Sequence, residues 1–277
     1  MKSFSRNWPP KRATRKTVNH VTISIVSYCQ RNLLHRCLAQ ISSLALPSTW
    51  QTIVVDNNSQ DGSADMVTNN YRWVKLVRLE KNLGFAGGHN IAYAQTDSPI
   101  FLVLNPDVIV LPGSIQTLIE TFHKFPKAAI VGPCLLNPDG SPQFSARRFY
   151  TWWTIACRRF PIPGRQKVNA YHLMTDCDLS QLLDVDWILG AAMGIRRAAF
   201  ARKKLFDSRY RLYFEDVDLC YFARKNGWDV LYCPSSKMIH DHQRVSASSI
   251  FNRAKLYHFV SWLKFWWKSK DCLRPRP

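Results

Sequence analysis

Short apolar runs rich in β-branched residues alternate with helix-like segments through the first half of the chain. The pattern predicts strands over residues 21–26, 52–55, 74–79 and 100–104. It predicts helices over residues 32–44, 63–70 and 113–125, and another after a glycine-rich loop that begins near residue 82. Strands that alternate with helices form parallel sheets. We therefore expect an α/β fold with a mostly parallel central sheet flanked by helices.

Polar residues directly follow each predicted strand or precede the next helix: Ser27-Tyr28, Asp56-Asn57-Asn58, the segment from Asn82 to Asn90, and Asn105-Pro106-Asp107. In open α/β sheets, ligands bind outside the carboxyl ends of the strands. We expect these four loops to converge on one ligand-binding cleft.

The second half of the chain has a less regular pattern. It predicts a turn at residues 137–140, a mobile or irregular stretch over 147–178, and an apolar strand over 185–195 that is interrupted by Gly190 and Gly194. It also predicts a helix that begins near Glu215 and ends at Asn226-Gly227, a strand over 229–233, and a loop that contains His240. Residues 248–267 again show helical spacing of apolar residues and are rich in tryptophan.

At 277 residues the chain is long enough for one large domain with a full core. No apolar run approaches the roughly 18 residues of a membrane span, and the N-terminus lacks the apolar core of a signal peptide. Eight scattered cysteines form no CxxC pair, which favours reduced, buried thiols over disulfides or a zinc site. We expect a cytoplasmic protein.

Positive charge gathers at the two ends of the chain, which has a net charge of +19. The pattern predicts a basic, disordered arm over residues 1–17, a folded domain over 18–247, and a basic aromatic tail over 248–277. Basic ends around a more balanced body suit an anionic surface, either membrane or nucleic acid. The alternative is solvated charge that serves solubility.

Asp107 follows an apolar strand, and Pro106 stiffens the turn before it. A Mg²⁺ or Mn²⁺ ion on a nucleotide needs only one or two protein carboxylates, because phosphate oxygens supply other ligands. Asp107 is therefore a candidate metal ligand, and His240 is a candidate second ligand through its neutral imidazole. The alternatives are a capping or turn role for Asp107 and a plain surface position for His240.

The segment from Asn82 to Asn90 contains three glycines, which let backbone amides approach a phosphate or sugar closely. It does not match GxGxxG and leads to no Walker lysine, so a P-loop NTPase is disfavoured. A plain turn before a helix is the alternative interpretation.

Glu215, Asp216 and Asp218 stand at the start of a predicted helix, where the helix dipole favours negative charge. Three acids beside aromatic residues in so basic a chain also predict a carboxylate that accepts a proton. Adjacent helix positions point apart, so the three acids cannot all share one role.

Taken together, these segments resemble the family 2 glycosyltransferases of the GT-A fold, in particular their bacterial rhamnosyltransferase-like branch. The resemblance covers about residues 20–245 and rests on motifs in the expected order: VTISIVSY, IVVDNNSQDGS, NLGFAGGHN, FLVLNPD, VGPCLLNPDGS, DWILGAAMGIRR, FDSRYRLYFEDVDLC and GWDVLYCPSSKMIH. It implies a nucleotide-diphosphate sugar bound at the carboxyl edge of the sheet together with a divalent metal, Mg²⁺ or Mn²⁺.

The resemblance also implies residue roles. The donor-binding residues would be Ser27 and Tyr28 near the base, Asp56 and Asn58 in the next loop, and Asn82, Gly84, Gly87, Asn90 and Asn105 toward the ribose and diphosphate. Asp107 matches the last Asp of the family's DxD metal motif, in which Asn105 replaces the first, and His240 matches its metal-ligand histidine. Asp216 matches the catalytic base. The sugar or acceptor pocket would be lined by Trp187, Gly190, Ala191 and Glu215.

The implied reaction is a single displacement that inverts the anomeric carbon, with Asp216 as the proton acceptor. The branch implies dTDP-rhamnose as donor and a saccharide or lipid-linked saccharide as acceptor in cell-surface polysaccharide synthesis, with hexosamine and galactofuranose donors still open. A nucleotidyltransferase would need a Gly-rich, basic signature where this chain has Ser-Tyr-Cys-Gln-Arg. A nucleic-acid-binding protein would need a basic face on its body. We expect neither, and no nucleic-acid partner.

In the tail, apolar residues recur at helical spacing with lysines beside them: Phe259, Trp262, Phe265 and Trp266. This stripe has two interpretations. It lies flat on an anionic membrane, which would place the protein at the inner face of the cell membrane near a lipid-linked acceptor, or it packs on the catalytic domain.

Overall fold

The computed structural model describes residues 20–159, 163–200, 202–210, 213–241 and 253–269. The predicted basic arm over residues 1–17 lies outside the described residues. In the described part of the chain, no helix is long and apolar enough to cross a membrane.

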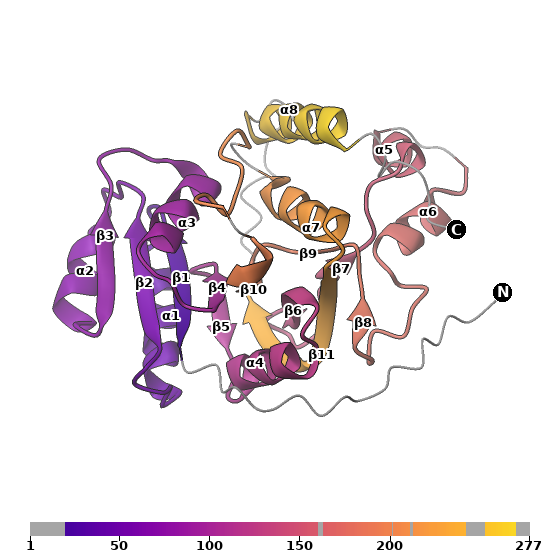
Figure 1. The fold of residues 1–277 in the computed structure, drawn as a ribbon. Coiled ribbons are helices and arrows are strands. Elements are labelled where there is room, and N and C mark those ends of the chain that lie inside the picture. Colours follow the sequence, from indigo (N-terminus) through magenta and orange to yellow (C-terminus); the bar gives the residue numbers. More distant parts are fainter. Residues whose placement is uncertain (1–19, 160–162, 201, 211–212, 242–252, 270–277) are drawn as a thin grey trace.

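A nine-stranded sheet forms the centre of the fold, with the strand order β3-β2-β1-β4-β10-β6-β11-β5 and β8 beside β11 (Figure 1). Its strands are β1 (Val21–Ser27), β2 (Gln51–Asp56), β3 (Val74–Arg78), β4 (Ile100–Leu104), β5 (Val108–Val110), β6 (Ala128–Leu136), β8 (Leu183–Asp184), β10 (Ala192–Arg196) and β11 (Asp229–His240). The first four strands are mutually parallel, as predicted. The second half is mixed, because β10 runs antiparallel to both β4 and β6.

Helices cover both faces of this sheet. They are α1 (Arg31–Ser43), α2 (Ser63–Asn70), α3 (Gly84–Ala94), α4 (Ser114–Lys124), α5 (Trp152–Arg159), α6 (Arg165–His172), α7 (Glu215–Lys225) and α8 (Arg253–Lys268), with a short 3-10 turn η1 (Arg197–Ala199). A small second sheet pairs β7 (Ala146–Arg147) with β9 (Trp187–Ile188). The expected α/β fold with a helix-flanked sheet is therefore confirmed.

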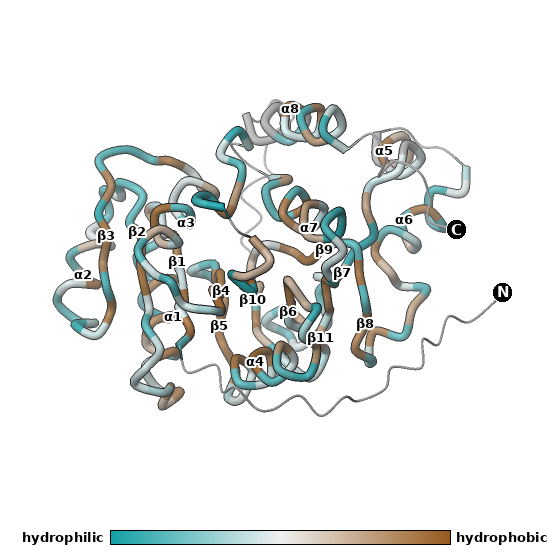
Figure 2. Tube along the Cα trace, in the orientation of Figure 1, coloured by the Kyte–Doolittle hydropathy of each residue, from teal (hydrophilic) through white to brown (hydrophobic). Residues whose placement is uncertain are grey.

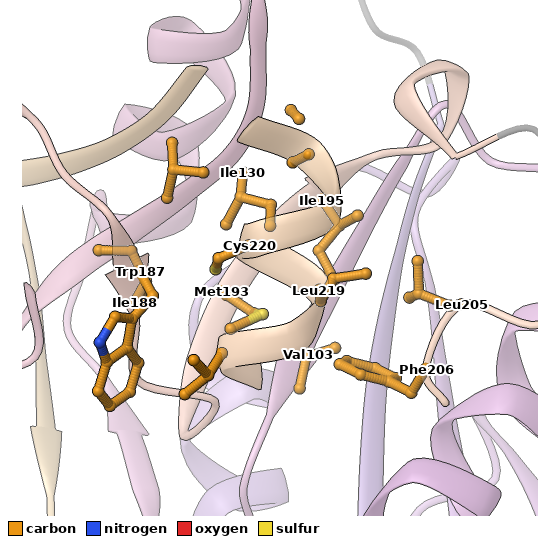
Figure 3. Packing of buried hydrophobic residues seen from close by; sticks show 14 of the residues in the cluster. Val103, Ile130, Trp187, Ile188, Met193, Ile195, Leu205, Phe206, Leu219 and Cys220 are labelled. Atoms are coloured by element: carbon orange, nitrogen blue, oxygen red, sulfur yellow. The ribbon is translucent and has the colours of Figure 1, made fainter. Parts of the chain in front are cut away.

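Two hydrophobic cores lie on opposite faces of the sheet, because strand side chains alternate between faces. In β4, Phe101 and Val103 join the core beneath α3 and α7, whereas Ile100, Leu102 and Leu104 join the core beneath α1 and α4. Figure 3 shows Leu219 and Cys220 of α7 packed over the side chains of β4 and β10. Figure 2 shows hydrophobic stretches along strands of the sheet and hydrophilic stretches in several of the connecting loops.

Residues 185–195 form two strands, because the chain leaves β9 after Ile188 and enters β10 at Ala192; the interruption expected at Gly190 is observed, whereas Gly194 lies within β10. Two other expectations for the second half were wrong. The stretch over 147–178 is not irregular throughout, since α5 and α6 form there and pack against each other. The strand expected over 229–233 continues as β11 to His240, which therefore ends a strand rather than lying on a loop.

The C-terminal helix α8 packs on the domain. Phe265 is 1% exposed, and its ring lies 5.6 Å from that of Phe214 and 5.8 Å from that of Tyr221, measured between centroids. Lys268 Nζ lies 2.7 Å from the carboxylate of Asp218, which is itself buried. Of the two interpretations of the tail, packing on the catalytic domain is therefore observed for Phe265. Trp267, by contrast, is 68% exposed.

Candidate active site

The first two strands end in a pair of buried polar side chains. Ser27 and Asp56 are register partners at the carboxyl ends of β1 and β2. Asp56 Oδ2 accepts the Ser59 backbone N–H at 3.0 Å, but Asp56 Oδ1 and Ser27 Oγ make no hydrogen bond to any described residue. A buried polar atom without a partner is costly. This pair is therefore suited to a ligand that brings its own donors, as a nucleotide base or ribose does.

Asn57 joins this edge to the glycine-rich segment. Its Oδ1 accepts the Leu83 N–H at 2.9 Å, and its Nδ2 donates to the Gly84 carbonyl at 3.1 Å. Asn57 was expected in a binding loop, but its contacts with the neighbouring glycine-rich segment were not predicted. Its side-chain amide bonds the Leu83 N–H and the Gly84 carbonyl, and such contacts between segments leave no sequence pattern around Asn57 itself.

The glycine-rich segment is mostly helix. Asn82 Oδ1 accepts the Gly84 N–H at 2.8 Å, and Gly84, at a φ of 71°, begins α3. A Cβ at Gly87 would lie 2.6 Å from Leu83 Cβ, so this glycine permits the first turn to close. The Asn90 amide exchanges two 2.8 Å hydrogen bonds with the Phe206 backbone, which fixes the 202–210 segment over α3. The Asn90 side chain is thus buried and bonded to the protein, whereas Asn82 is exposed at the start of the segment.

Two other expected donor residues lie at the same edge. Tyr28 is 51% exposed just beyond β1, where its ring is available to a ligand. Asn58 adopts a φ of 67°, the left-handed conformation that asparagine tolerates in turns.

Asp107 and His240 meet through the pairing of β5 with β11. Val108 and His240 are register partners, and Asp107 O accepts the Asp241 N–H at 2.9 Å. This pairing places His240 Nε2 3.5 Å from Asp107 Oδ1, with both side chains nearly buried. The surface position weighed for His240 is thus wrong, and the two side chains lie side by side, as a shared metal ion would require.

The side-chain atoms of Asp107 and His240 that face each other are suitable ligands for a divalent cation. Asp107 Oδ1 is buried and makes no hydrogen bond to a described residue. A carboxylate oxygen and a neutral imidazole nitrogen are suitable ligands for Mn²⁺, and the carboxylate suits Mg²⁺. No group of three or more His, Cys, Asp or Glu side chains is arranged for a metal among the described residues. The remaining ligands would therefore have to come from the substrate and water.

Asp216 lies at the first turn of α7, between two backbone donors. Its Oδ2 accepts the Gly190 N–H at 2.8 Å, and its Oδ1 accepts the Val217 N–H at 2.9 Å. Burial raises the pKa of Asp216, and these two hydrogen bonds oppose that rise. The result is an oriented carboxylate with a pKa above the ordinary aspartate value.

Glu215 is buried beside Asp216, and the two carboxylates differ in their surroundings. Burial, followed by the negative charge of Asp216, raises the pKa of Glu215 to about 8. Its Oε2 makes no hydrogen bond within the described part of the chain. Burial and the neighbouring charge therefore both favour the protonated form of Glu215.

Asp218 has a different, structural environment. Its carboxylate accepts a hydrogen bond from Tyr210 Oη at 3.1 Å and pairs with Lys268 of α8. The surroundings of Asp218 thus differ from those of Glu215 and Asp216, as expected of acids that do not share one role.

The segment between β9 and β10 connects Asp216 to the turn that holds Asp107. Gly190 contacts Asp216, and the next residue, Ala191, accepts the Asn105 N–H through its carbonyl at 2.8 Å. Trp187 is only 3% exposed, stacks on Tyr150 and donates Nε1–H to Arg148 O at 3.0 Å. Trp187 thus supports this segment from the core rather than presenting its ring at the surface.

The family model for glycosyl transferase family 2 matches residues 22–200, which is more than half of the chain. The chain belongs to this family. Asp216 and His240 lie beyond the matched residues, and they join the rest of the site through the Gly190 hydrogen bond and the pairing of β11 with β5. The chain is thus a glycosyltransferase, as the sequence resemblance implied.

Relatives of this glycosyltransferase include two rhamnosyltransferases. It is 27% identical over 278 aligned positions to the N-acetylglucosaminyl-diphospho-decaprenol L-rhamnosyltransferase of Mycobacterium tuberculosis, covering 88% of this chain and 85% of the relative. It is also 27% identical to the rhamnosyltransferase WbbL of Escherichia coli, covering 88% of this chain and 92% of the relative. These relatives support the rhamnosyltransferase-like branch.

A solved structure with the same fold is the mannosyltransferase PcManGT of Pyrobaculum calidifontis, in complex with GDP-Man and Mn²⁺. The TM-score is 0.63 at 14% identity, and the match covers 93% of this chain and 65% of that one. The present chain thus spans less than two thirds of that protein, and the likeness confirms the fold.

Proposed function

We propose that this glycosyltransferase transfers a sugar from a nucleotide-diphosphate donor to a hydroxyl of a saccharide or lipid-linked saccharide, with inversion, in cell-surface polysaccharide synthesis. The observation that carries the proposal is the hydrogen-bonded connection from Asp216 through Gly190 and Ala191 to the turn that holds Asp107. The segment that contains Gly190 and Ala191 thereby connects the proposed proton acceptor to the turn of the proposed metal ligand.

Asp216 acts as the general base in this mechanism. It takes the proton of the acceptor hydroxyl while the oxygen attacks the anomeric carbon and the bond from that carbon to the diphosphate breaks. The electron pair of that bond leaves with the diphosphate. Because the new bond forms opposite the bond that breaks, the configuration inverts. The backbone donors from Gly190 and Val217 aim the carboxylate before the substrate arrives.

Asp107 and His240 would hold a divalent ion, Mg²⁺ or Mn²⁺, on the diphosphate side. When bound, this ion offsets the charge that develops on the leaving diphosphate. Asn105 orients the turn through its backbone bond to Ala191, which leaves its side chain available to the donor. Ser27, Tyr28, Asp56 and Asn58 would bind the nucleoside, and Asn82 and Gly84 the phosphates. The protonated Glu215 would donate a hydrogen bond to a sugar hydroxyl.

The names of the two rhamnosyltransferases support a rhamnose donor, for which dTDP-rhamnose is the first candidate, and a diphospho-lipid-linked saccharide as acceptor. We place the protein in the cytoplasm, at the inner face of the cell membrane. The exposed Trp267 on α8 and Trp153 on α5 support contact with a lipid surface.

The test is a screen of nucleotide sugars for thermal stabilisation, followed by transfer assays with the donor that stabilises most and determination of the product's anomeric configuration by NMR. A matched donor should raise the unfolding temperature, because a ligand that binds only the native state stabilises it by mass action. A product that retains the donor's configuration would contradict the single displacement.

A further inference from the structure

Gln143 lies against the ring and backbone of His240. Its Nε2 donates to the His240 carbonyl at 2.8 Å, and its Oε1 lies 2.8 Å from His240 Nδ1. The sequence placed Gln143 just after a predicted turn and gave it no role. Its position follows from the end of β6, since the Gln143 N–H donates to Leu135 O at 2.8 Å.

The orientation of the Gln143 amide is determined by its neighbours. Nε2 faces two oxygens that can only accept, the His240 carbonyl and Asn137 Oδ1, each at 2.8 Å. A flipped amide would set its own oxygen against both of them. Oε1 is therefore the atom beside the imidazole, and an amide oxygen can only accept a hydrogen bond.

The donor-to-acceptor direction of the hydrogen bonds is also determined in the turn at residues 137–141. The Ser141 hydroxyl donates to Asp139 Oδ1 at 2.6 Å, so Ser141 Oγ accepts from Asn137 Nδ2 at 2.8 Å. This leaves Asn137 Oδ1 as the acceptor for Gln143 Nε2. The carboxylate of Asp139, which only accepts, thus fixes the direction of every donor between itself and Gln143.

We propose that Gln143 is a positioning residue that keeps the proton of the neutral His240 imidazole on Nδ1. The electron pair of Nε2 is then directed toward Asp107 Oδ1, 3.5 Å away, where a cation can lie between the two atoms. In the opposite tautomer, Nε2–H would donate to Asp107 Oδ1 and occupy both atoms that a cation needs. The inference rests on the proposed function, in which this pair holds the metal.

Two substitutions test the accepting oxygen of Gln143 separately from its donating nitrogen. Gln143→Met removes both, whereas Gln143→Glu removes the donor to the His240 carbonyl but keeps an oxygen that accepts from Nδ1–H. Asn137→Ala is the matched control, because it removes one partner of Nε2 and leaves Oε1 in place.

The tautomer is read by NMR of protein with ¹⁵N-labelled histidine, with the His240 signals assigned from His240→Asn. Mn²⁺ affinity in the presence of dTDP is measured by electron paramagnetic resonance.

We expect the Nδ1–H tautomer in the wild type, Asn137→Ala and Gln143→Glu, and the Nε2–H tautomer in Gln143→Met. Mn²⁺ affinity should fall about 10- to 100-fold in Gln143→Met, the usual loss when the hydrogen-bond partner of a ligating histidine is removed. The inference would be overturned if folded Gln143→Met kept the Nδ1–H tautomer. It would also be overturned if Gln143→Glu lost that tautomer in the same way as Gln143→Met. If the tautomers behave as expected but the wild type binds no Mn²⁺, the proposed metal site fails while the role of Gln143 in setting the tautomer stands.

Discussion

Asp216 Oδ2 accepts the backbone N–H of Gly190 at 2.8 Å, so the proposed base is held by the segment that joins β9 to β10. A Cβ at Gly190 would lie 3.2 Å from Asp216 Cβ and 3.3 Å from Oδ2. The absence of a side chain at this position therefore permits the contact.

Gly190→Ala should misplace the base without removing it. Because the added methyl group must displace Asp216 or the 189–191 segment, we expect the turnover number to fall about tenfold or more, as small misplacements of catalytic groups cost up to about a hundredfold. Steady-state kinetics and donor-induced thermal stabilisation provide the measurement. Unchanged turnover in Gly190→Ala would mean that this contact does not set the position of the base.

The buried Glu215 should make stability depend on pH. Its pKa is raised from 4.5 to about 8 in the folded protein, so between these values the native state binds more protons than the unfolded chain. Stability is therefore greatest below this window, and the free energy of unfolding falls as the pH rises through it. Glu215→Gln removes the titrating group. Relative to the wild type, its unfolding temperature should gain more at about pH 8 than at about pH 5. An equal difference at both pH values would contradict a raised pKa.

The proposed metal site predicts two linked effects. Asp107→Ala should weaken donor binding when metal is present and change it little in chelator, because it removes a ligand that binds the donor through the ion. Chelation should inhibit the wild type. Full activity in excess chelator would exclude a required metal, and the asparagine at position 105, in place of the family's first acid, makes this experiment informative.

The exposed aromatic face of α8 predicts membrane binding that is separable from folding. Trp267→Ala should reduce sedimentation with phosphatidylglycerol vesicles and leave the unfolding temperature nearly unchanged, because Trp267 is 68% exposed. The buried Phe265 provides the contrast, since Phe265→Ala should cost about 3–5 kcal/mol of stability. Equal vesicle binding by folded Trp267→Ala and the wild type would remove this residue from any anchor.

Local patterns in the sequence predicted the first half of the fold well. The strands β1 to β4 are short, β-branched and bounded by polar loops, so their periodicity and the parallel order both followed from the sequence. The donor residues at their ends could be chosen on the same grounds. Asp107 and Asp216 were found because an acid directly after a strand or at a helix start is a local signal.

Long-range pairing explains what the sequence did not predict. β5 is three residues long and exists because it pairs with β11, which also extends that strand to His240. Asn57 and Gln143 act on segments 26 and 97 residues away in the chain, through side-chain hydrogen bonds that leave no periodic pattern. Trp187 was expected at the pocket, but its contacts with Tyr150 and Arg148 place its ring in the core.

The comparison of Asp216→Asn with Asp218→Asn tests the account most directly. Both acids lie on the first turn of α7, but Asp216 is the proposed base, whereas Asp218 binds Tyr210 and Lys268. With the donor identified by thermal stabilisation, Asp216→Asn should fold and bind that donor yet lose turnover by about a hundredfold or more. Asp218→Asn should lose stability and keep most of its turnover per folded molecule. Transfer by Asp216→Asn at a rate close to that of the wild type would contradict the assignment of Asp216 as the base.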